Sequence, residues 1–526
     1  MILSHLPSRR GWRVVAALGC CAAACGDDRD VTRLLFANDV LVGVAPARPD
    51  AGAETTVEPP DSTVAPDVEV VTGACGMGRR AAYEFPSRFV PGASSVEYSA
   101  AVLRHVLGAE LGGFVESVTA RFEAGERLAE GELLLAAGVW LESSGEELAD
   151  VEISLSLPGA PALVERRHGE LSSEGALLSV MAGRDPVADH RRWSEPQAFI
   201  GFEDFALGRG GRTSFSPEEL VRACLEQVEV NARNRAIGFL QADPARNALP
   251  LHLTSNGRDL GRLIRSFLLG AVAFSRGVDA ELDDDVPGFG LLASNERAGD
   301  SGYTFLEHAW DMGFGYFGAA RDYDGGVRIE GASEGAWFDT NADCFVGLQS
   351  EVNYGAALGA AVAAQRGAED FGRRAFDAFV EGRRLIVVAP SALTADQLDE
   401  LIALRDRASD AWEHALAAAS VHALNQLSLQ VSEAVASTIE YSFAAQAGYW
   451  SELKGTSLAF QFNRRSPFSA VDLAEFHRLI GDAPRVPDTL PPTNGASLNA
   501  YLEDLRRARD ILQATYGFDG ATISAW

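Results

Sequence analysis

The sequence predicts a mainly α-helical protein, a helical bundle with a small β hairpin or strand accessory. Apolar residues recur every three or four positions over residues 96–123, which is the period of an amphipathic helix. Strand signals are few, because only residues 149–157 alternate apolar with polar side chains. Three further helix starts carry capping signals: Ser216 before Pro217, Thr394 with Gln397, and Ser469 with Asp472.

The expected helices also have recognisable ends and a plausible centre. Gly481 and Gly517 are placed where helices commonly terminate. Residues 396–437 form a long, Ala-rich stretch that suits the middle of a bundle. A folded part of roughly 450 residues exceeds one ordinary core, so we expect the helical domain at 79–526 to divide into two packed subdomains, about 79–300 and 301–526.

Residues 1–24 are expected to be a lipoprotein signal peptide. Three arginines precede an apolar run, residues 14–24, that is too short to cross a bilayer. Small residues lead up to Cys25, as a lipoprotein signal peptidase requires. We therefore expect lipidation at Cys25. Cys20 and Cys21 are rival sites, but the acidic GDD that follows Cys25 favours Cys25.

Residues 25–78 are expected to be the lipidated cysteine and a flexible acidic tether. Their composition, rich in Asp, Glu, Pro, Thr and Ala, buries too little apolar surface to order itself. A coil of about 50 residues would reach roughly 40 Å. These features predict a protein of the cell envelope, on the periplasmic or surface side and most simply at the outer membrane, with the membrane bound through the N-terminal lipid.

The charge of the chain argues against nucleic acid as a partner. The formal net charge is -29, and removal of the signal takes away three arginines and no acid, which leaves -32. Such a chain repels phosphate backbones and anionic lipid. Three cysteines follow the signal, Cys75, Cys224 and Cys344, which permits one disulfide in an oxidising compartment and leaves the choice of pair open.

The segment EHAWDMGFGYFG, residues 307–318, is the densest group of candidate ligands. His308 and Asp311 share a helical face with Gly315, where small residues allow close approach of a backbone or ligand. An imidazole and a carboxylate three residues apart can hold one cation such as iron or zinc, or form a buried pair that joins two helices. Glu307 is adjacent in sequence, but neighbouring helical residues point about 100° apart.

His422 is the best distant candidate to complete a metal site with His308 and Asp311. It follows a face of small residues that implies close helix packing, so a buried core histidine is the simpler interpretation. A metal held by these side chains would activate water, which is the basis of an alternative prediction, a metal-dependent hydrolase. The chain offers no obvious general base beside them.

A second candidate is the loop sequence DTNADCFVGLQSE, residues 339–351. Asp339, Asn341 and Asp343 have the D-x-N-x-D spacing that turns three oxygen ligands toward one calcium ion. The sixth position is Cys344 instead of glycine, and the acid at the end, Glu351, falls one position late. The spacing therefore predicts either a calcium loop or a plain polar turn.

Several segments resemble an uncharacterised family of bacterial envelope lipoproteins, a domain of unknown function. They are YEFPSRFVPGASSVEYSAAVLRHVL, EHAWDMGFGYFG, AFDAFVEGRR, AWEHALAAASVHALNQL and YWSELKGTSLAFQFN, in that order from Tyr83 onward. The family is more distantly similar to imelysin-like helical bundles linked to iron uptake, in which His308 and Asp311 would correspond to a His-x-x-Glu motif. The resemblance also implies that relatives carry a fuller calcium-type loop at the position of residues 339–351, with glycine in place of Cys344 and an acid in place of Gly347.

Together these observations predict a non-catalytic envelope lipoprotein that binds a ligand or metal, with an accessory role in iron or haem acquisition implied by the resemblance. The partner would be a small ligand or an envelope protein. The alternatives are the metal-dependent hydrolase and a structural protein that works through its surface.

Overall fold

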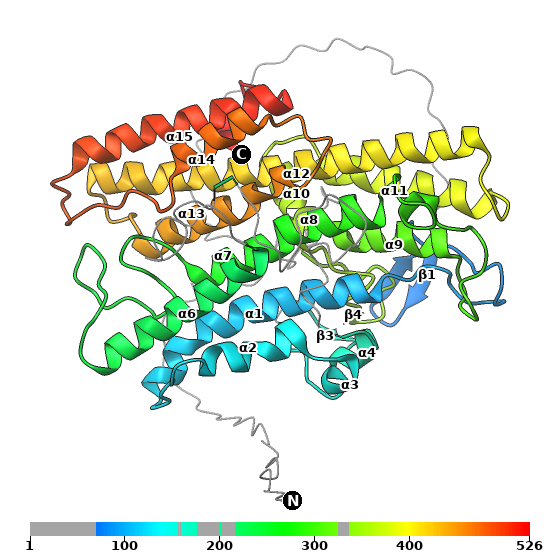
Figure 1. Ribbon diagram of the computed structural model, residues 1–526, viewed down its shortest axis with the longest axis horizontal. Helices are drawn as coiled ribbons and strands as arrows, with labels where there is room; N and C mark the ends of the chain where they lie inside the picture. The colour runs from blue at the N-terminus through cyan, green and yellow to red at the C-terminus, as the bar shows by residue number, and fades with distance from the viewer. Residues whose placement is uncertain (1–69, 156, 158, 176–199, 202–215, 324–335) are drawn as a thin grey trace, which may run out of the picture. The chain divides into compact units, whose positions relative to one another are not determined.

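The computed structural model describes residues 70–155, 157, 159–175, 200–201, 216–323 and 336–526 (Figure 1). Helices dominate these residues and the strands are short, which confirms the predicted mainly α helical bundle. The signal, Cys25 and most of the tether lie outside the described residues. Within them, no helix combines the length and apolar character needed to cross a membrane.

The elements of the first half are β1 (Val70–Gly73), β2 (Gly76–Arg79), α1 (Ser99–Glu123), α2 (Glu132–Glu142), α3 (Gly145–Leu148), β3 (Ala162–Leu163), α4 (His168–Leu171), α6 (Pro217–Ala236), α7 (Leu260–Ser266), η1 (Phe267–Val272), α8 (Ala273–Arg276), η2 (Gly277–Glu281) and η3 (Gly290–Leu292). Elements α7, η1, α8 and η2 form one unbroken helical run, with π-helical turns in η1 and η2.

The elements of the second half are α9 (Phe305–Phe317), β4 (Phe345–Val346), α10 (Gly355–Gln365), α11 (Phe371–Val388), α12 (Ala395–Ala436), α13 (Phe443–Ser457), η4 (Leu458–Gln461), α14 (Ala470–Ile480), α15 (Gly495–Tyr516) and η5 (Ile523–Ala525). The longest of them, α12, has 42 residues and spans about 63 Å at the usual helical rise.

The predicted helix starts are confirmed at their capping residues. The side chains of Ser216 and Thr394 each accept a hydrogen bond from the backbone N–H three residues on. The side chain at that later position in turn accepts a hydrogen bond from the backbone N–H of the capping residue. Ser469 accepts from the N–H of Asp472 in the same way. These bonds satisfy N–H groups that have no partner inside the helix, which is why short polar residues mark these boundaries.

The predicted strand at residues 149–157 is wrong. Its described part forms one isolated bridge, between Glu152 and Arg167, and no ladder. The backbone N–H of Ser154 donates to the carboxylate of Glu110 on α1 instead of to a neighbouring strand. The β accessory is found elsewhere, in the antiparallel hairpin of β1 and β2 and in the two-residue parallel pair of β3 and β4.

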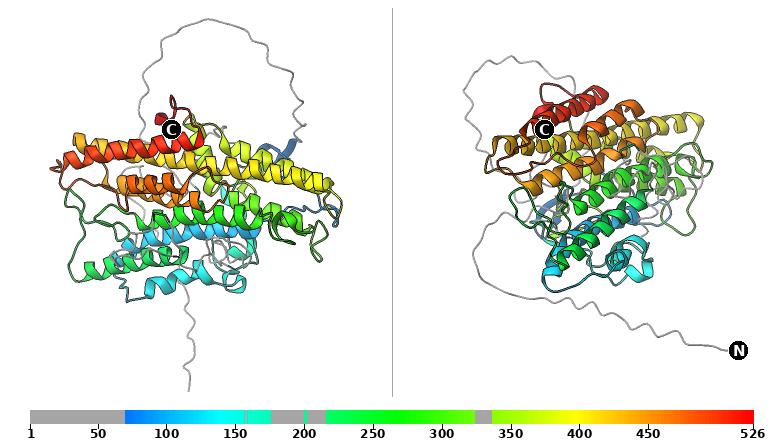
Figure 2. Two further views of the ribbon diagram at one scale, coloured as in Figure 1. Left: turned by 45° about the horizontal axis from the view of Figure 1, so that its top comes forward. Right: turned by 60° about the vertical axis from the view of Figure 1, so that its left-hand side comes forward.

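The long helix α12 is the hub of the C-terminal helices. It contacts α10, α11, α13 and α15, while α7 links α13 to α1, and α1 in turn contacts α2, α6 and α9 (Figures 1 and 2). One continuous cluster of buried apolar side chains extends from Tyr83 to Trp526. The expected division near residue 300 stays a prediction.

Helix α1 is buried more widely than its predicted apolar stripe. The stripe itself is confirmed, but every residue from Ala101 to Gly112 is buried, since α7 and α9 cover different sides of the helix. Small residues make this possible. A Cβ atom at Gly112 would lie 3.4 Å from the carbonyl oxygen of Gly261 on α7, so the two backbones pass unusually close.

A buried acid–base pair fastens the small helices α2 to α4 onto α1. The His168 Nε2 lies 2.8 Å from a carboxylate oxygen of Glu110, and His168 Nδ1 lies 3.1 Å from the carbonyl oxygen of Val151. Trp140 on α2 also donates to Glu110. Both ring nitrogens of His168 therefore face oxygen atoms, and Glu110 joins α1 to α2 and α4 through these contacts.

His105 on α1 is a second buried histidine, held against α9. Its Nε2 lies 3.1 Å from the carbonyl oxygen of Gly315 and 3.2 Å from that of Tyr316, and its ring stacks on Tyr354. Burial lowers the pKa of His105 to about 4, although the two backbone hydrogen bonds oppose this shift. The ring is therefore neutral at pH 7, and its Nε2–H donates a hydrogen bond to the backbone carbonyl oxygens of α9.

His105 should make the fold sensitive to mild acid. His105 becomes protonated near pH 6.5 in the unfolded chain and only near pH 4 in the folded chain. The free energy of unfolding therefore falls as the pH drops between these values, by up to about 3 kcal/mol. We expect His105→Gln, which keeps an N–H donor but does not titrate, to show a shallower loss of stability. Urea unfolding at pH 7, 6, 5 and 4 measures the slope, and equal slopes in both proteins would contradict the prediction.

Candidate functional site

Helix α9 places the segment EHAWD in the interior of the bundle. Thr304 caps the helix by accepting from the N–H of Glu307, and the Glu307 carboxylate accepts from the N–H of Thr304 at 2.8 Å. The helix ends at Gly318, whose positive φ of 85° favours glycine. Between these ends, Glu307 and Asp311 are both buried.

Arg383, a fully buried residue of α11, binds both carboxylates of α9. Its Nε donates to the Oδ1 of Asp311 at 2.8 Å, and its Nη1 lies 3.1 Å from the Oε1 of Glu307. The two acids are four residues apart, so successive turns of α9 present them to one guanidinium. This ion-paired group, Arg383 with Glu307 and Asp311, is called the Arg383 network below.

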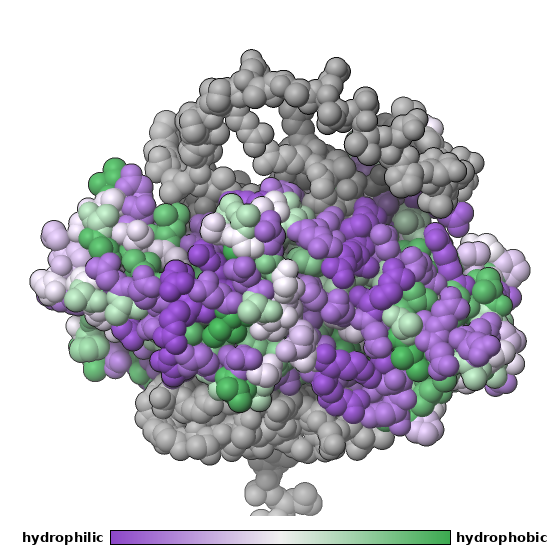
Figure 3. Space-filling model, turned by 90° about the horizontal axis from the view of Figure 1, so that it is seen from above, coloured by the Kyte–Doolittle hydropathy of each residue, from purple (hydrophilic) through white to green (hydrophobic). Residues whose placement is uncertain are grey.

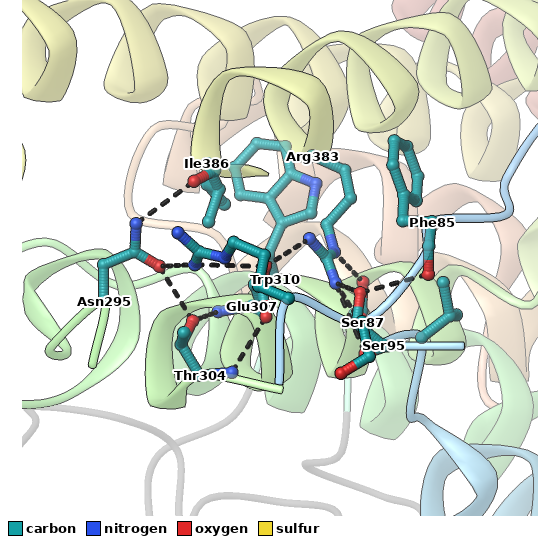
Figure 4. A network of polar contacts seen from close by, with 12 residues as sticks. Phe85, Ser87, Ser95, Asn295, Thr304, Glu307, Trp310, Arg383 and Ile386 are labelled. Atoms are coloured by element: carbon teal, nitrogen blue, oxygen red, sulfur yellow. Dashed lines mark hydrogen bonds and ion pairs between the residues drawn. The ribbon is translucent and has the colours of Figure 1, made fainter. Parts of the chain in front are cut away.

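The segment before α1 closes the Arg383 network from another side. The Tyr83 hydroxyl donates to Asp311 at 2.8 Å, and the N–H of Glu97 donates to the other oxygen of Asp311 at 3.2 Å. Arg383 donates to the Ser95 hydroxyl at 2.7 Å and lies over the ring of Phe85, 5.0 Å from its centroid. Figure 4 shows Phe85 and Ser95 beside Arg383.

On its outer side the network continues to the loop before α9 and the end of α11. Arg88 forms a second ion pair with Glu307 at 3.2 Å and donates to the amide oxygen of Asn295 at 2.9 Å. Asn295 in turn donates to the carbonyl oxygens of Ile386 and Pro390. Figure 4 shows Asn295, Thr304 and Glu307 facing one another next to Arg383.

Burial and charge act in opposite directions on this group. Desolvation disfavours the charge of Arg383, but the carboxylates of Asp311 and Glu307 outweigh it and raise the pKa of Arg383 above its usual value. Burial, together with the charge of Asp311, raises the pKa of the Tyr83 hydroxyl well above its usual value. Tyr83 therefore keeps its proton and acts as a hydrogen-bond donor.

The residues of the EHAWD segment that converge in the structure are Glu307 and Asp311, not His308 and Asp311 as the sequence predicted. Glu307 and Asp311 converge, although the sequence argument had set Glu307 apart, because a guanidinium is wide enough to reach both turns. His308 lies to one side, where its Nδ1 is 3.2 Å from the carbonyl oxygen of Glu97 and its ring stacks on Tyr303. Asp311 joins α9 to α11 through Arg383, whereas His308 contacts the backbone of Glu97.

The structure does not assemble the expected metal site. His422 is buried on α12. Throughout the described ranges, no three His, Cys, Asp or Glu side chains gather so that they could hold a metal ion. His422 therefore does not complete a site with His308 and Asp311. Gly315 serves backbone packing, since a Cβ atom there would lie 2.8 Å from the Cβ of Tyr98 and 2.9 Å from that of Ala101.

Arg383 and Tyr83 are the members of the network that the search for ligand motifs missed. Neither belongs to a metal or catalytic pattern, and they lie 72 and 228 residues from Asp311. A signal was nevertheless present, since Tyr83, Asp311 and Arg383 lie in three of the segments that carry the resemblance. The contacts between those segments are made in this network.

In the candidate calcium loop the oxygen ligands bind backbone N–H groups. Asp339 accepts from the N–H of Asp343 at 3.0 Å and of Cys344 at 3.1 Å, and Asp343 accepts from that of Phe345. Glu351 folds back onto the N–H groups of Thr340 and Gly347. Burial raises the pKa of Glu351, an effect that these hydrogen bonds oppose.

A disulfide joins this loop to the N-terminal hairpin and settles the cysteine pairing. Cys344 bonds to Cys75, while Cys224 is free and buried. Cys344 has a φ of 75°, a left-handed conformation for which a calcium loop uses glycine at this position. This chain instead has a disulfide-bonded cysteine there. The hairpin lies directly on the loop, since a Cβ atom at Gly73 would overlap the carbonyl group of Ala342.

Comparison with known proteins brings no match: no family model, no curated protein and no solved structure matches this chain. The resemblance to envelope lipoproteins and to imelysin-like bundles therefore stays a prediction.

Replacing Arg383 should destabilise the fold strongly. Arg383→Met would leave the buried carboxylate of Asp311 without its cation and Glu307 with Arg88 alone, and breaking a buried pair typically costs about 3–5 kcal/mol. The neighbouring exposed Arg384 is the matched control, since a surface substitution usually changes stability by no more than about 0.5 kcal/mol. Urea unfolding of the Arg383→Met and Arg384→Met variants makes the comparison, and similar stabilities would contradict a structural role for the network.

Calcium should add little stability through the 339–351 loop. Its carboxylates already accept backbone hydrogen bonds, so we expect Asp343→Ala to cost about 1 kcal/mol, because the bonds that its carboxylate accepts from Phe345 and Asn341 are lost equally with calcium and with chelator. Thermal unfolding under both conditions tests this. If calcium raises the Tm of the wild type and fails to do so in Asp343→Ala, the loop is an ion site, as its spacing suggested.

Proposed function

We propose that this chain is a cell-envelope lipoprotein, anchored through Cys25 and a flexible tether, whose helical domain acts by non-catalytic binding at its surface. The observation that carries the second part is the Arg383 network. Its acids are the side chains most suited to hold a metal or activate water, and both are buried and bound to arginine. This use of the acids supports a structural role for the EHAWD segment.

The anchor is supported by the sequence and by the cysteine chemistry. The signal pattern ends at Cys25, and a disulfide between Cys75 and Cys344 is consistent with an oxidising compartment. The strongly acidic surface suits a soluble domain held near a membrane without adhering to anionic lipid. An envelope protein or a small ligand remains the proposed partner, and a role in iron or haem acquisition stays a prediction from the resemblance.

The hydrolase alternative has less support. It needs a metal ligand set that includes His308, Asp311 and a distant histidine, and the contacts of Asp311 go instead to Arg383, Tyr83 and the backbone of Glu97. No cluster of side chains among the described residues favours iron, zinc or calcium over the others. The identity of a bound metal therefore stays a prediction from the sequence.

The anchor is tested by the mass of the mature N-terminus. The full chain is expressed in a bacterium with lipoprotein processing, and its N-terminal peptide is analysed by mass spectrometry. We expect an acylated peptide that begins at residue 25, lost in Cys25→Ala and retained in Cys20→Ala and Cys21→Ala. An unmodified N-terminus, or acylation that survives Cys25→Ala, would refute the anchor at Cys25.

A further inference from the structure

One end of the bundle exposes apolar side chains from three loops that are far apart in sequence. Ile237, Phe239 and Leu240 follow α6, Ile439 lies between α12 and α13, and Leu490 lies between α14 and α15. Their exposed fractions range from 38% for Leu490 to 97% for Ile439. These five residues are called the apolar loop face.

The three loops lie together around a hollow of about 340 Å³. Its lining includes Pro244, Pro250, Leu253, Tyr441, Phe443 and Leu490. Leu253 and Phe443 also belong to a small apolar cluster of their own, apart from the main core. The hollow lies at the end where α12 passes into α13, the left-hand end in Figure 1. In Figure 3, which views the molecule from above, this end carries hydrophobic residues in green mixed with hydrophilic ones in purple.

Large apolar side chains exposed this fully on neighbouring loops usually mark a surface that contacts a membrane or a partner. Here they project from loops instead of forming one flat helical face. Side chains on loop tips suit shallow insertion among lipid headgroups and the first acyl carbons, which requires no complementary shape.

The length of chain that precedes the described residues indicates that the membrane is within reach of the apolar loop face. The 45 residues 25–69 separate the proposed lipid anchor from β1, and fully extended they span about 150 Å. This exceeds the length of about 63 Å estimated for α12. An extended tether therefore allows any side of the domain, including its far end, to reach the bilayer.

We propose that the apolar loop face is a second membrane contact, which inserts into the headgroup region of the bilayer that holds the lipid anchor. The inference rests on the proposed lipoprotein anchor. Because the chain carries a large net negative charge, the attraction comes from apolar insertion, and zwitterionic lipid is the favoured surface. The anchor holds the protein at the membrane, and the apolar loop face orients the domain on it.

A fluorescent probe at Ile439 tests the contact. The lipidated full chain carrying Ile439→Cys is labelled with an environment-sensitive dye and floated with phosphatidylcholine vesicles that contain a nitroxide lipid. Cys224 is buried and Cys75 is bonded to Cys344, so the introduced thiol reacts selectively. Val388→Cys is the matched control, because Val388 is 78% exposed and precedes the opposite end of α12.

We expect the probe at residue 439 to be quenched about five-fold more strongly than the probe at residue 388, since only side chains inserted in the bilayer meet the nitroxide. The difference should persist in high salt. Equal quenching at both positions, or none at either in floated protein, would overturn the contact; in the second case a protein partner is the better occupant. Protein that does not float refutes the anchor as well, so the two failures are distinguishable.

Charge substitutions give an independent arm of the test. With the probe moved to Leu240→Cys, we expect Ile439→Asp to reduce quenching up to about five-fold, to the level of the probe at residue 388, because a carboxylate in the inserted loop opposes transfer out of water. Val388→Asp should leave it unchanged. Both positions are exposed, so neither change should disturb folding. Equal quenching in the two variants would overturn the proposal.

Discussion

The ion pairs between Arg383 and the two acids of α9 are the constraint on which the centre of this fold depends. Charged groups taken out of water are tolerated only when each has a partner and further hydrogen bonds. Arg383 meets Glu307 and Asp311, and Asp311 also accepts from Tyr83 and from the backbone of Glu97. Helices α9 and α11 must therefore assemble together, since removing either one leaves a buried charge unpaired. Removing the segment before α1 would take away hydrogen bonds to Asp311 and Arg383.

This requirement also explains why a promising functional motif serves structure. The EHAWD segment has the composition of a ligand site, and its acids do hold a cation, namely an arginine of the same chain. The same arrangement appears at smaller scale where Glu110 and His168 fasten α2 to α4 onto α1. Polar residues that are rare in cores here select one packing of helices whose apolar faces would otherwise allow several.

Outside this centre, the features that suggest activity lie in loops. At the N-terminal side, the Cys75–Cys344 disulfide holds the hairpin against the 339–351 loop and gives the tether a covalent attachment close to where the described chain begins. Beyond the C-terminal end of α12, the apolar loop face extends into water. An exposed loop surface of this kind, together with the proposed lipid anchor, is expected of a protein that works by contact.

The sequence by itself determined the local features. Helical periodicity predicted α1, and the capping residues Ser216 and Thr394 predicted where α6 and α12 begin, because these signals depend on neighbours within one turn. Tertiary structure alone decided that Asp311 pairs with Arg383, that Cys75 bonds to Cys344, and that the described residues between 149 and 157 form no strand. Each of these depends on groups many residues away, and only the packing of whole helices brings them together. For this reason the candidate residues were found in the sequence, but their role was not.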